Sequence, residues 1–437
     1  MTHDRQRVES RSARRASEEQ QHPTSEAVPP AGRGRVLILV QNLSVPFDRR
    51  VWLECQSLVG AGFEVAVVCP KAPGDRTYSR LNGVDLFKYR PYAPGGSSTS
   101  FVIEYAYSFF ATFLLSLRAS WSGRFTVVQS CNPPDLFWPI GIIFRLLNGS
   151  AFVFDHHDLC PELYQSRFPD GNKFVYRALR LMERRTMRTA DHVIATNDSY
   201  RQIALERDGV AQARVTVVRT GPDLTRLSRT AAEPGLRRAR AHLAAYLGVM
   251  GPQDGVDLLL EIIDHVVHRL GRRDISFTLI GSGDCFDDLV EQSHRLKLTD
   301  FVTFTGRISD GDVSAILSSA DVGISPDPKN PLNDVSTMNK TMEYMAFALP
   351  VVAFDLRETR ISAGDAAVYA TPNDVGEFAQ LLVDLLDDES RRFTMGLAGR
   401  ARIEHALAWK HQAPRYVEVY EKLTRDSHRR IPATAGN

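Results

Sequence analysis

The chain has 437 residues, of which 43% are hydrophobic, so it is long enough for two α/β domains with ordinary cores. Its 53 basic and 52 acidic residues give a net charge of +1, which provides no overall field for holding nucleic acid. Five scattered cysteines include no C-x-x-C pair, which predicts free thiols in a reducing compartment rather than a disulfide framework or a zinc knuckle.

Residues 1–34 contain almost no large apolar side chains, which predicts a disordered tail, and they lack the apolar core of a secretory signal. The longest apolar segment, "FVIEYAYSFFATFLLSLR" at 101–118, is interrupted by Glu104, Ser108 and Ser116. We expect it to form a crossover helix packed on a sheet, and a helix lying on a membrane surface is the alternative. The predicted location is therefore the cytoplasm, with the inner face of the membrane as the alternative.

From residue 35 onward, short apolar runs alternate with helical periodicity. The helical segments of the first half are "RRVWLECQSLVGAG", the apolar segment at 101–118 and "FVYRALRLMERRTMRTA". Such alternation predicts a doubly wound parallel sheet, here over residues 35–223. The predicted strands are "RVLILVQN" at 35–42, "EVAVVCP" at 64–70, "FTVVQSCNPP", "AFVFDHHD", "HVIATN" and "VTVVRTGPD" at 215–223.

A polar and basic stretch with a Pro-Gly break, residues 224–240, predicts a linker. The same alternation then resumes over 241–405 with "HLAAYLGVMG", "GVDLLLEIIDHVVHRL", "SFTLIGSGD", "VTFTGRI" and "AAVYATPND", followed by a helical segment at 406–425 and a polar tail at 426–437. We therefore expect two doubly wound, Rossmann-like α/β domains facing a cleft, with ligands at the carboxyl ends of the strands.

The stretch "NPLNDVSTMNKTMEYMAFALPVVAFD" at 330–355 predicts a loop, a helix and a buried strand. Ser336 or Thr337 is expected to cap the helix, and Lys340 can then reach an anion at its N-terminus. The alternative is an ordinary capped helix with a solvated lysine. Glu343 precedes an apolar run, so its carboxylate either faces the cleft or is costly to bury, and in the cleft it would suit a ribose diol.

Two further motifs remain open. "IGSGD" at 280–284 fits a tight turn as well as a ligand contact. In "DHHD" at 155–158, adjacent strand residues point to opposite faces, so His156 and His157 do not easily share a metal ion. The basic helix face with Arg177, Arg180, Arg184, Arg185 and Arg188 is expected to be solvated, and docking of a lipid-linked acceptor on an anionic surface is the alternative.

Taken in order, several segments make the chain resemble a family 4 glycosyltransferase of GT-B architecture over residues 35–425. They are "QNLSVPFDRRVWLECQSLVGAGFEVAVVCP", "FDHHDLCPELY", "GVMGPQDGVDLLLE", "LIGSGD", "FTGRI" and "EYMAFALPVVAFD". The resemblance implies transfer of a sugar from a nucleotide diphosphate donor with retention of anomeric configuration, without a metal or another cofactor. It also implies that the C-terminal helix returns to the N-terminal domain.

On the donor side, the resemblance makes Glu343 the acid that holds the donor ribose. The family's first acid would fall at Val335, beside Asn333 and Asp334, and its phosphate-binding arginine and lysine would fall at Val249 and Asp254. A desolvated diphosphate needs other cations, so we hypothesise that Lys340 replaces the missing lysine. The full set of expected donor-binding residues is Glu343, Lys340, Ser336, Thr337, Asn339, Gly248, Gly251, Gly281, Arg219 and Asp334.

On the other side of the expected cleft, the resemblance places His157 and Asp158 beside the donor sugar, and a structural histidine is the alternative. Asp48, Arg49 and Arg50 become acceptor or phosphate contacts, although either arginine could be a solvated helix-start residue. Glu162 is either an acceptor-side group or the N-terminal acid of the next helix. The implied mechanism is front-face substitution, which needs charge stabilisation and positioning rather than a protein nucleophile.

Three function classes follow from this pattern. The first is a glycosyltransferase whose partners are a nucleotide-sugar donor and a hydroxyl-bearing glycan, lipid-linked or small-molecule acceptor, in surface polysaccharide, glycolipid or secondary-metabolite synthesis. The second is a nucleotide-sugar epimerase on the same architecture. The third is a catalytically inactive donor-binding or scaffold subunit. No nucleic-acid partner is expected, and peripheral membrane contact is left open.

Overall fold

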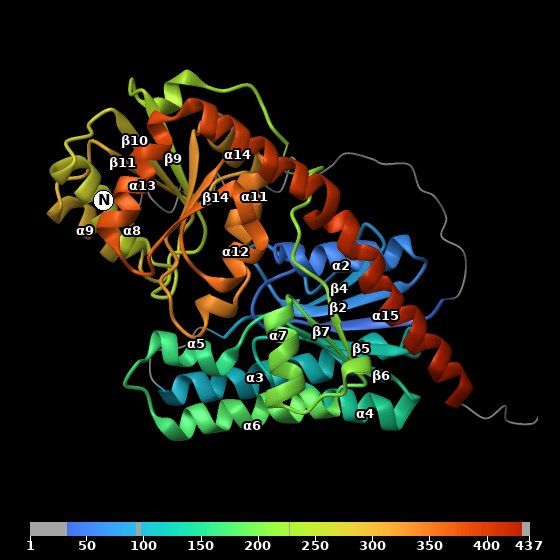
Figure 1. Cartoon of the computed structure of the whole chain (residues 1–437). Coiled ribbons are helices and arrows are strands. Elements are labelled where there is room, and N and C mark those ends of the chain that lie inside the picture. Colours follow the sequence, from blue (N-terminus) through green and yellow to red (C-terminus); the bar gives the residue numbers. More distant parts are fainter. Residues whose placement is uncertain (1–32, 93–97, 227, 431–437) are drawn as a thin grey trace, which may run out of the picture. The chain divides into compact units, whose positions relative to one another are not determined.

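A computed structural model describes residues 33–92, 98–226 and 228–430 (Figure 1). The predicted disordered tail lies outside the described residues except for Arg33 and Gly34. The chain forms two compact units. The N-terminal unit comprises residues 33–221, Asn330–Thr337 and 407–430, and the C-terminal unit comprises Pro222–Lys329 and Met338–Ala406. The divisions at 221 and 406 fall close to the predicted domain boundaries, and the predicted linker clusters with the C-terminal unit.

The N-terminal unit contains a sheet in the order β3-β4-β2-β1-β5-β6-β7-β8, in which every neighbouring pair is parallel except β3 and β4. The hairpin formed by those two edge strands was not predicted; its turn, Asn82-Gly83, has positive φ at both residues. The strands are β1 (Arg35–Leu39), β2 (Glu64–Pro70), β3 (Tyr78–Leu81), β4 (Val84–Tyr89), β5 (Val127–Cys131), β6 (Ala151–His156), β7 (His192–Ala195) and β8 (Val215–Val217).

Helices cover both faces of this sheet. Figure 1 shows α3 (Ser98–Ser120), α4 (Trp138–Asn148), α5 (Cys160–Arg167) and α6 (Lys173–Thr189) on one face, and α2 (Arg49–Gly60) and α15 (Trp409–Arg430) on the other. A short helix, α7 (Asp198–Gln202), follows β7. Alternate residues of β1 enter separate cores on the two faces, which explains its uninterrupted apolar sequence.

Helix α15 packs on α2 and β8, which confirms that the C-terminal helix returns to the N-terminal domain. It extends to Arg430, so the prediction that a polar tail begins at residue 426 was wrong. The helix is amphipathic, with Tyr416 and Tyr420 fully buried.

The C-terminal unit contains a six-stranded parallel sheet in the order β11-β10-β9-β12-β13-β14. Its strands are β9 (His242–Leu247), β10 (Ile275–Ile280), β11 (Val302–Gly306), β12 (Val322–Ser325), β13 (Val351–Phe354) and β14 (Ala367–Ala370). Its helices are α8 (Val256–Asp264), α9 (Phe286–Arg295), α10 (Asp310–Ser319), α11 (Asn339–Ala346), α12 (Arg357–Ala363), α13 (Val375–Asp387) and α14 (Glu389–Arg402). Both sheets therefore confirm the predicted doubly wound α/β fold.

The strand orders locate one switch point in each sheet, between β1 and β5 and between β9 and β12. At such a point the connections diverge to opposite sides, leaving a crevice at the carboxyl ends of the strands where ligands bind in open α/β sheets. Most of the predicted site residues lie in the loops that follow β1, β9 and β12 and in the helices α2 and α11.

Candidate functional site

The loop after β1 places its three predicted residues in different environments. Asp48 is the N-cap of α2, and its Oδ1 accepts the Val51 N–H at 3.1 Å. Arg49 is exposed, whereas Arg50 is only 6% exposed. Arg50 is therefore not a solvated helix-start residue, and its burial requires charged partners.

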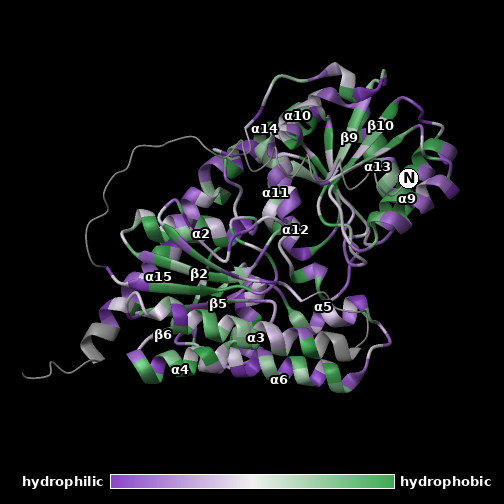
Figure 2. Ribbon diagram, turned by 180° about the vertical axis from the view of Figure 1, so that it is seen from behind, coloured by the Kyte–Doolittle hydropathy of each residue, from purple (hydrophilic) through white to green (hydrophobic). Residues whose placement is uncertain are grey.

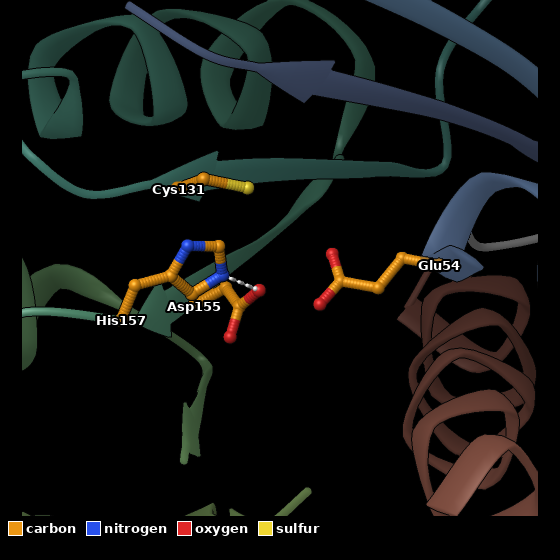
Figure 3. Close-up of side chains that lie close together, drawn as sticks. All are labelled: Glu54, Cys131, Asp155 and His157. Carbon is orange, nitrogen blue, oxygen red and sulfur yellow. Dashed lines mark hydrogen bonds and ion pairs between the residues drawn. The ribbon is translucent and has the colours of Figure 1, made fainter. Parts of the chain in front are cut away.

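Those partners surround the Arg50 guanidinium (Figure 3 shows the acidic and histidine side chains). Arg50 Nε lies 2.9 Å from Oε1 of Glu54 and 2.9 Å from Nε2 of His157, and Nη2 lies 3.0 Å from Oδ1 of Asp155. Asp155 Oδ2 in turn lies 2.5 Å from His157 Nε2. A buried arginine thus joins α2, the helix that follows β1, to the end of β6.

The pKa values of the two buried acids in this cluster shift in opposite directions. Burial raises the pKa of Asp155, but Arg50 and His157 outweigh it and hold that pKa well below its usual range. Burial, reinforced by the nearby Asp155 charge, raises the pKa of Glu54 well above its usual value. Burial thus favours the protonated form of Glu54, whereas the Asp155 carboxylate is held as the ion-pair partner of Arg50.

Glu54, Cys131, Asp155 and His157 also offer atoms within 4.8 Å of one another, the spacing of a metal site (Figure 3). The Arg50 guanidinium already contacts three of these four residues. Burial raises the pKa of the Cys131 thiol well above its usual value, which opposes the thiolate form that binds metals. We therefore interpret the cluster as an arginine-centred ion-pair network.

The backbone of the predicted catalytic pair is held by a residue that the sequence did not single out. Asn132 Oδ1 accepts the N–H groups of His157 and Asp158 at 2.5 and 3.1 Å, and its Nδ2 donates to the Asp158 carbonyl at 2.6 Å. Burial raises the pKa of the Asp158 carboxyl group. The His157 side chain is 14% exposed, so its imidazole is fixed by Asp155 and still reaches the surface.

The neighbouring histidine has other surroundings, as strand alternation led us to expect. His156 is fully buried, packs against Tyr200, and lies 3.7 Å from Glu183. Burial and nearby positive charges lower its pKa to about 3, so it is neutral at pH 7. His156 belongs to the core beneath α6 and not to the cluster around Arg50.

Two further predicted residues of the N-terminal unit are held in ion pairs. Glu162, in the first turn of α5, pairs with Arg207. The Arg219 guanidinium, 12% exposed, lies 3.8 Å from Asp198. The first contact joins α5 to the helical turn Ile203–Arg207, and the second joins α7 to the segment after β8.

The prediction that Ser336 or Thr337 caps a helix was wrong. Helix α11 begins at Asn339, and its N-cap residue, Met338, makes no side-chain capping bond. The two hydroxyl groups bind elsewhere. Thr337 Oγ1 accepts from the Asn197 side chain at 3.0 Å, and Ser336 Oγ donates to the Leu332 carbonyl at 2.7 Å.

The segment Asn330–Thr337 therefore clusters with the N-terminal unit. Ser336 Oγ also lies 2.9 Å from the Tyr200 hydroxyl, and the Asn197 side chain donates to the Val335 carbonyl at 2.9 Å. Val335 packs against the apolar core beneath the sheet, and Asp334 is half-buried in the preceding turn. The position at which the family carries its first acid is thus occupied by a packed valine.

In the C-terminal unit, Lys340 is buried rather than solvated. Its Nζ lies 2.5 Å from Oδ1 of Asp327, with side chains 8% and 2% exposed, and 5.2 Å from the centre of the Tyr246 ring. Burial lowers the Lys340 pKa, but Asp327 and Asp254 outweigh it and leave the pKa raised, so the ammonium is charged. Ser325 Oγ donates to Asp327 at 2.6 Å and fixes the acid after β12.

The loop after β9 lies directly over this ion pair. A Cβ added at Gly248 would lie 2.9 Å from the Tyr246 hydroxyl and 3.0 Å from Lys340 Cε, so a larger residue here would displace one of these side chains. Gly281 has φ +129°, and a Cβ there would lie 1.8 Å from the Gly248 carbonyl oxygen. Asp254 Oδ2 accepts the Gly251 N–H at 3.0 Å and closes the loop. The glycines thus bring this backbone close to Lys340 at the switch point.

Glu343, on α11, is 17% exposed, and its Oε1 lies 3.6 Å from Nη2 of Arg226. Arg226 also pairs with Asp310, with 2.6 Å between Nη1 and Oδ1. Asn339, at the start of α11, is exposed. Arg226 belongs to the predicted linker, and no motif in the sequence indicated its contact with Glu343.

Two family descriptions match the chain. Residues 48–221 match the glycosyl transferase 4-like domain, and residues 241–388 match glycosyl transferases group 1. The glycogen synthase of Mycobacterium tuberculosis strain H37Rv is 26% identical over 247 residues, 56% of this chain and 57% of that protein. The MMP alpha-(1->4)-mannosyltransferase of Mycolicibacterium hassiacum is 28% identical over 245 residues, 55% of this chain and 56% of that protein. The matched regions thus span little more than half of these relatives.

Solved structures match over most of the chain. Sucrose-phosphate synthase from Thermosynechococcus elongatus superposes with a TM-score of 0.72 at 16% identity, covering 90% of this chain and 100% of that one. Alr3699/HepE from Anabaena, in complex with UDP, superposes with a TM-score of 0.65 at 15% identity, covering 89% and 100%. At these identities the likeness shows the fold, which is the predicted GT-B architecture.

Proposed function

The chain belongs to glycosyltransferase family 4, and from this premise we propose that it moves a sugar from a nucleotide diphosphate donor to a hydroxyl group with retention of anomeric configuration. The observation that carries the proposal is the partly exposed His157, held by Asp155 and Asn132 at the carboxyl end of β6. The complexes of Anabaena Alr3699/HepE with UDP and UDP-glucose support the choice of donor class. The comparisons give no support to an epimerase.

Within the C-terminal unit, we assign the donor ribose to Glu343. Its carboxylate is partly accessible, and a carboxylate accepts hydrogen bonds from two vicinal hydroxyls, as in dinucleotide-binding folds. Arg226 restrains the carboxylate and leaves it 17% exposed. The linker arginine therefore orients the ribose acid in our proposal.

We assign the phosphate-side cation to Lys340, beneath Gly248. The ammonium is charged, and the glycine lets the loop backbone lie against its side chain. Asp327 contacts this ammonium, and Asp254 closes the loop above it. These acids reduce the local positive potential, so donor binding in this chain depends on one shared cation rather than on an exposed arginine and lysine.

The proposed reaction is a front-face displacement. The acceptor oxygen forms a bond to the anomeric carbon while the bond to the departing phosphate oxygen breaks, and that oxygen takes the hydroxyl proton. His157 contacts the sugar at the reaction centre, and Asp155, through its short contact with Nε2, is a positioning residue. The protein supplies orientation and charge stabilisation, and no covalent intermediate forms on a side chain.

Release of nucleoside diphosphate tests this function. The full chain is incubated with UDP-, GDP-, ADP- and TDP-sugars, with and without glycan, lipid-linked and small-molecule hydroxyl acceptors. Release that depends on an acceptor supports the transferase. Donor binding without release under every condition would instead support an inactive donor-binding subunit, which the valines at 249 and 335 and the Lys340–Asp327 pair favour as the second candidate.

A further inference from the structure

Helix α3 carries a second apolar stripe that does not face the core. Its inner side packs Phe109 and Phe113 against the sheet. The next residue after each, Phe110 and Leu114, is 62% and 63% exposed, and Ile103 is 52% exposed. The exposed positions 103, 110 and 114 repeat at helical spacing, so they form one outward stripe, and Trp121, 85% exposed, lies just beyond its end.

Two other helices of the same layer also expose apolar side chains. On α6, Phe174 and Leu181 are 75% and 48% exposed and lie seven residues apart on one side of the helix. At the end of α4, Leu146 and Leu147 are 80% and 62% exposed. Figures 1 and 2 both place α3, α4 and α6 in one layer below the sheet, and Figure 2 shows hydrophobic residues along all three.

Exposed cations on α6 accompany these apolar residues. Arg177, Arg184, Arg185 and Arg188 are all exposed, and Arg177 lies over the Phe174 ring at 6.0 Å. The acid within α6, Glu183, is fully buried and paired with Arg207. The outer side of α6 is therefore apolar and positively charged, without an acid of its own to neutralise it.

We propose that the outer surface of α3, α4 and α6 docks the protein on an anionic lipid bilayer. Aromatic and leucine side chains would enter the headgroup region, and the arginines would bind lipid phosphates while their stems cover apolar surface. The charge selects this occupant: a second copy of the same face would bring like charges together, whereas an anionic bilayer complements them. None of the helices in the described part of the chain is long and apolar enough to cross a bilayer, so the contact would be peripheral.

This inference goes beyond the proposed function, because lipid binding is measurable without turnover. The test is co-sedimentation of the full chain with phosphatidylcholine vesicles that contain or lack phosphatidylglycerol. Phe110→Ser with Leu114→Ser tests the apolar stripe, and Arg185→Gln with Arg188→Gln tests the charge. The matched controls lie on α14, where Phe393 is 68% exposed: Phe393→Ser and Arg391→Gln.

We expect binding only to the anionic vesicles, with loss at high salt and a decrease of about tenfold or more in each α3 or α6 double variant. The α14 controls should bind like the wild type, and circular dichroism should show all variants folded. Failure of the wild type to bind, or equal binding to both vesicle types, would overturn the proposal. A wild-type dimer in lipid-free solution that Phe110→Ser with Leu114→Ser dissociates would assign the stripe to self-association instead. Nucleotide binding is measured in parallel on the same samples. Loss of vesicle binding with unchanged nucleotide binding therefore bears on the lipid contact alone and not on the proposed function.

Discussion

Nε2 of His157 lies 2.5 Å from Oδ2 of Asp155, at the end of β6 in the N-terminal unit. Asp155 is fully buried and is itself bound by Arg50, whereas His157 reaches the surface. The acid therefore fixes the orientation of an imidazole whose side chain is 14% exposed. In our proposal His157 contacts the substrate, and Asp155 positions His157.

Replacing His157 with Ala should lower kcat by about a hundredfold or more, because a positioned polar group at the reacting sugar is lost. Asp155→Asn should lower kcat less and leave the donor dissociation constant unchanged. The exposed His294 provides a control, and His294→Ala should behave like the wild type. Steady-state kinetics measures kcat, and a donor titration measures the donor dissociation constant. Equal losses in kcat and donor affinity for Asp155→Asn would contradict a positioning role.

Replacing Arg50 with Met should destabilise the protein by about 3–5 kcal/mol, because the buried Asp155 loses its cation. The depressed pKa of Asp155 contributes stability above the unfolded carboxyl pKa of about 3.9, and this contribution is lost as the pH falls further. Urea unfolding at pH 7 measures the change. The exposed neighbour gives the control, since Arg49→Met should cost about 1 kcal/mol or less. Equal effects at 49 and 50 would rule out the arginine-centred network.

Lys340→Met should weaken nucleoside diphosphate binding strongly if Lys340 is the cation that the diphosphate shares with Asp327. Asp327→Asn should then preserve or tighten binding, because it removes the competing carboxylate while the ammonium stays. Isothermal titration of both variants and of the double variant measures this. If the Lys340–Asp327 pair is only structural, each single variant should lose both stability and nucleotide binding, and the double variant should recover both. That result would contradict our assignment of Lys340.

If Glu343 holds the ribose, the wild type should bind a ribonucleoside diphosphate about tenfold or more tightly than its 2′-deoxy or 3′-deoxy form, because hydrogen bonds to a charged carboxylate are strong. Glu343→Ala should bind all three forms with similar affinity. The ligand series is its own control, since a general loss of folding would weaken all three equally. A variant that still prefers the ribose form would place the ribose elsewhere.

The sequence predicted the two sheets because parallel strands are buried on both faces and appear as apolar runs such as residues 36–39 of β1. It missed the antiparallel edge hairpin of β3 and β4, since three of the four residues of β3 are exposed and carry no apolar run. Local patterns thus indicated elements that are buried and periodic, and failed at the polar edge of the sheet.

Site residues were predicted less completely, because their partners are distant in sequence. Ser336 and Thr337 have the composition of a helix cap, but Tyr200 and Asn197 supply competing hydrogen bonds. Likewise, Lys340 was expected at an open helix end, but it pairs with Asp327, a buried acid that follows β12. Asp327 lies 13 residues earlier in the chain, so no local pattern indicated this pair. Family motifs indicated His157 and Glu343. The contacts of Asn132 with the His157 backbone and of Arg226 with Glu343 form only in the tertiary fold, so local patterns did not indicate them.

The most direct test of the account is the anomeric configuration of a transfer product, measured by proton NMR with the nucleotide sugar and acceptor that support nucleoside diphosphate release. We predict a new glycosidic linkage with the same anomeric configuration as the donor, formed by the wild type and formed about a hundredfold or more slowly by His157→Ala. A product of inverted configuration, or an isomerised donor sugar without transfer, would contradict the proposed retaining glycosyl transfer.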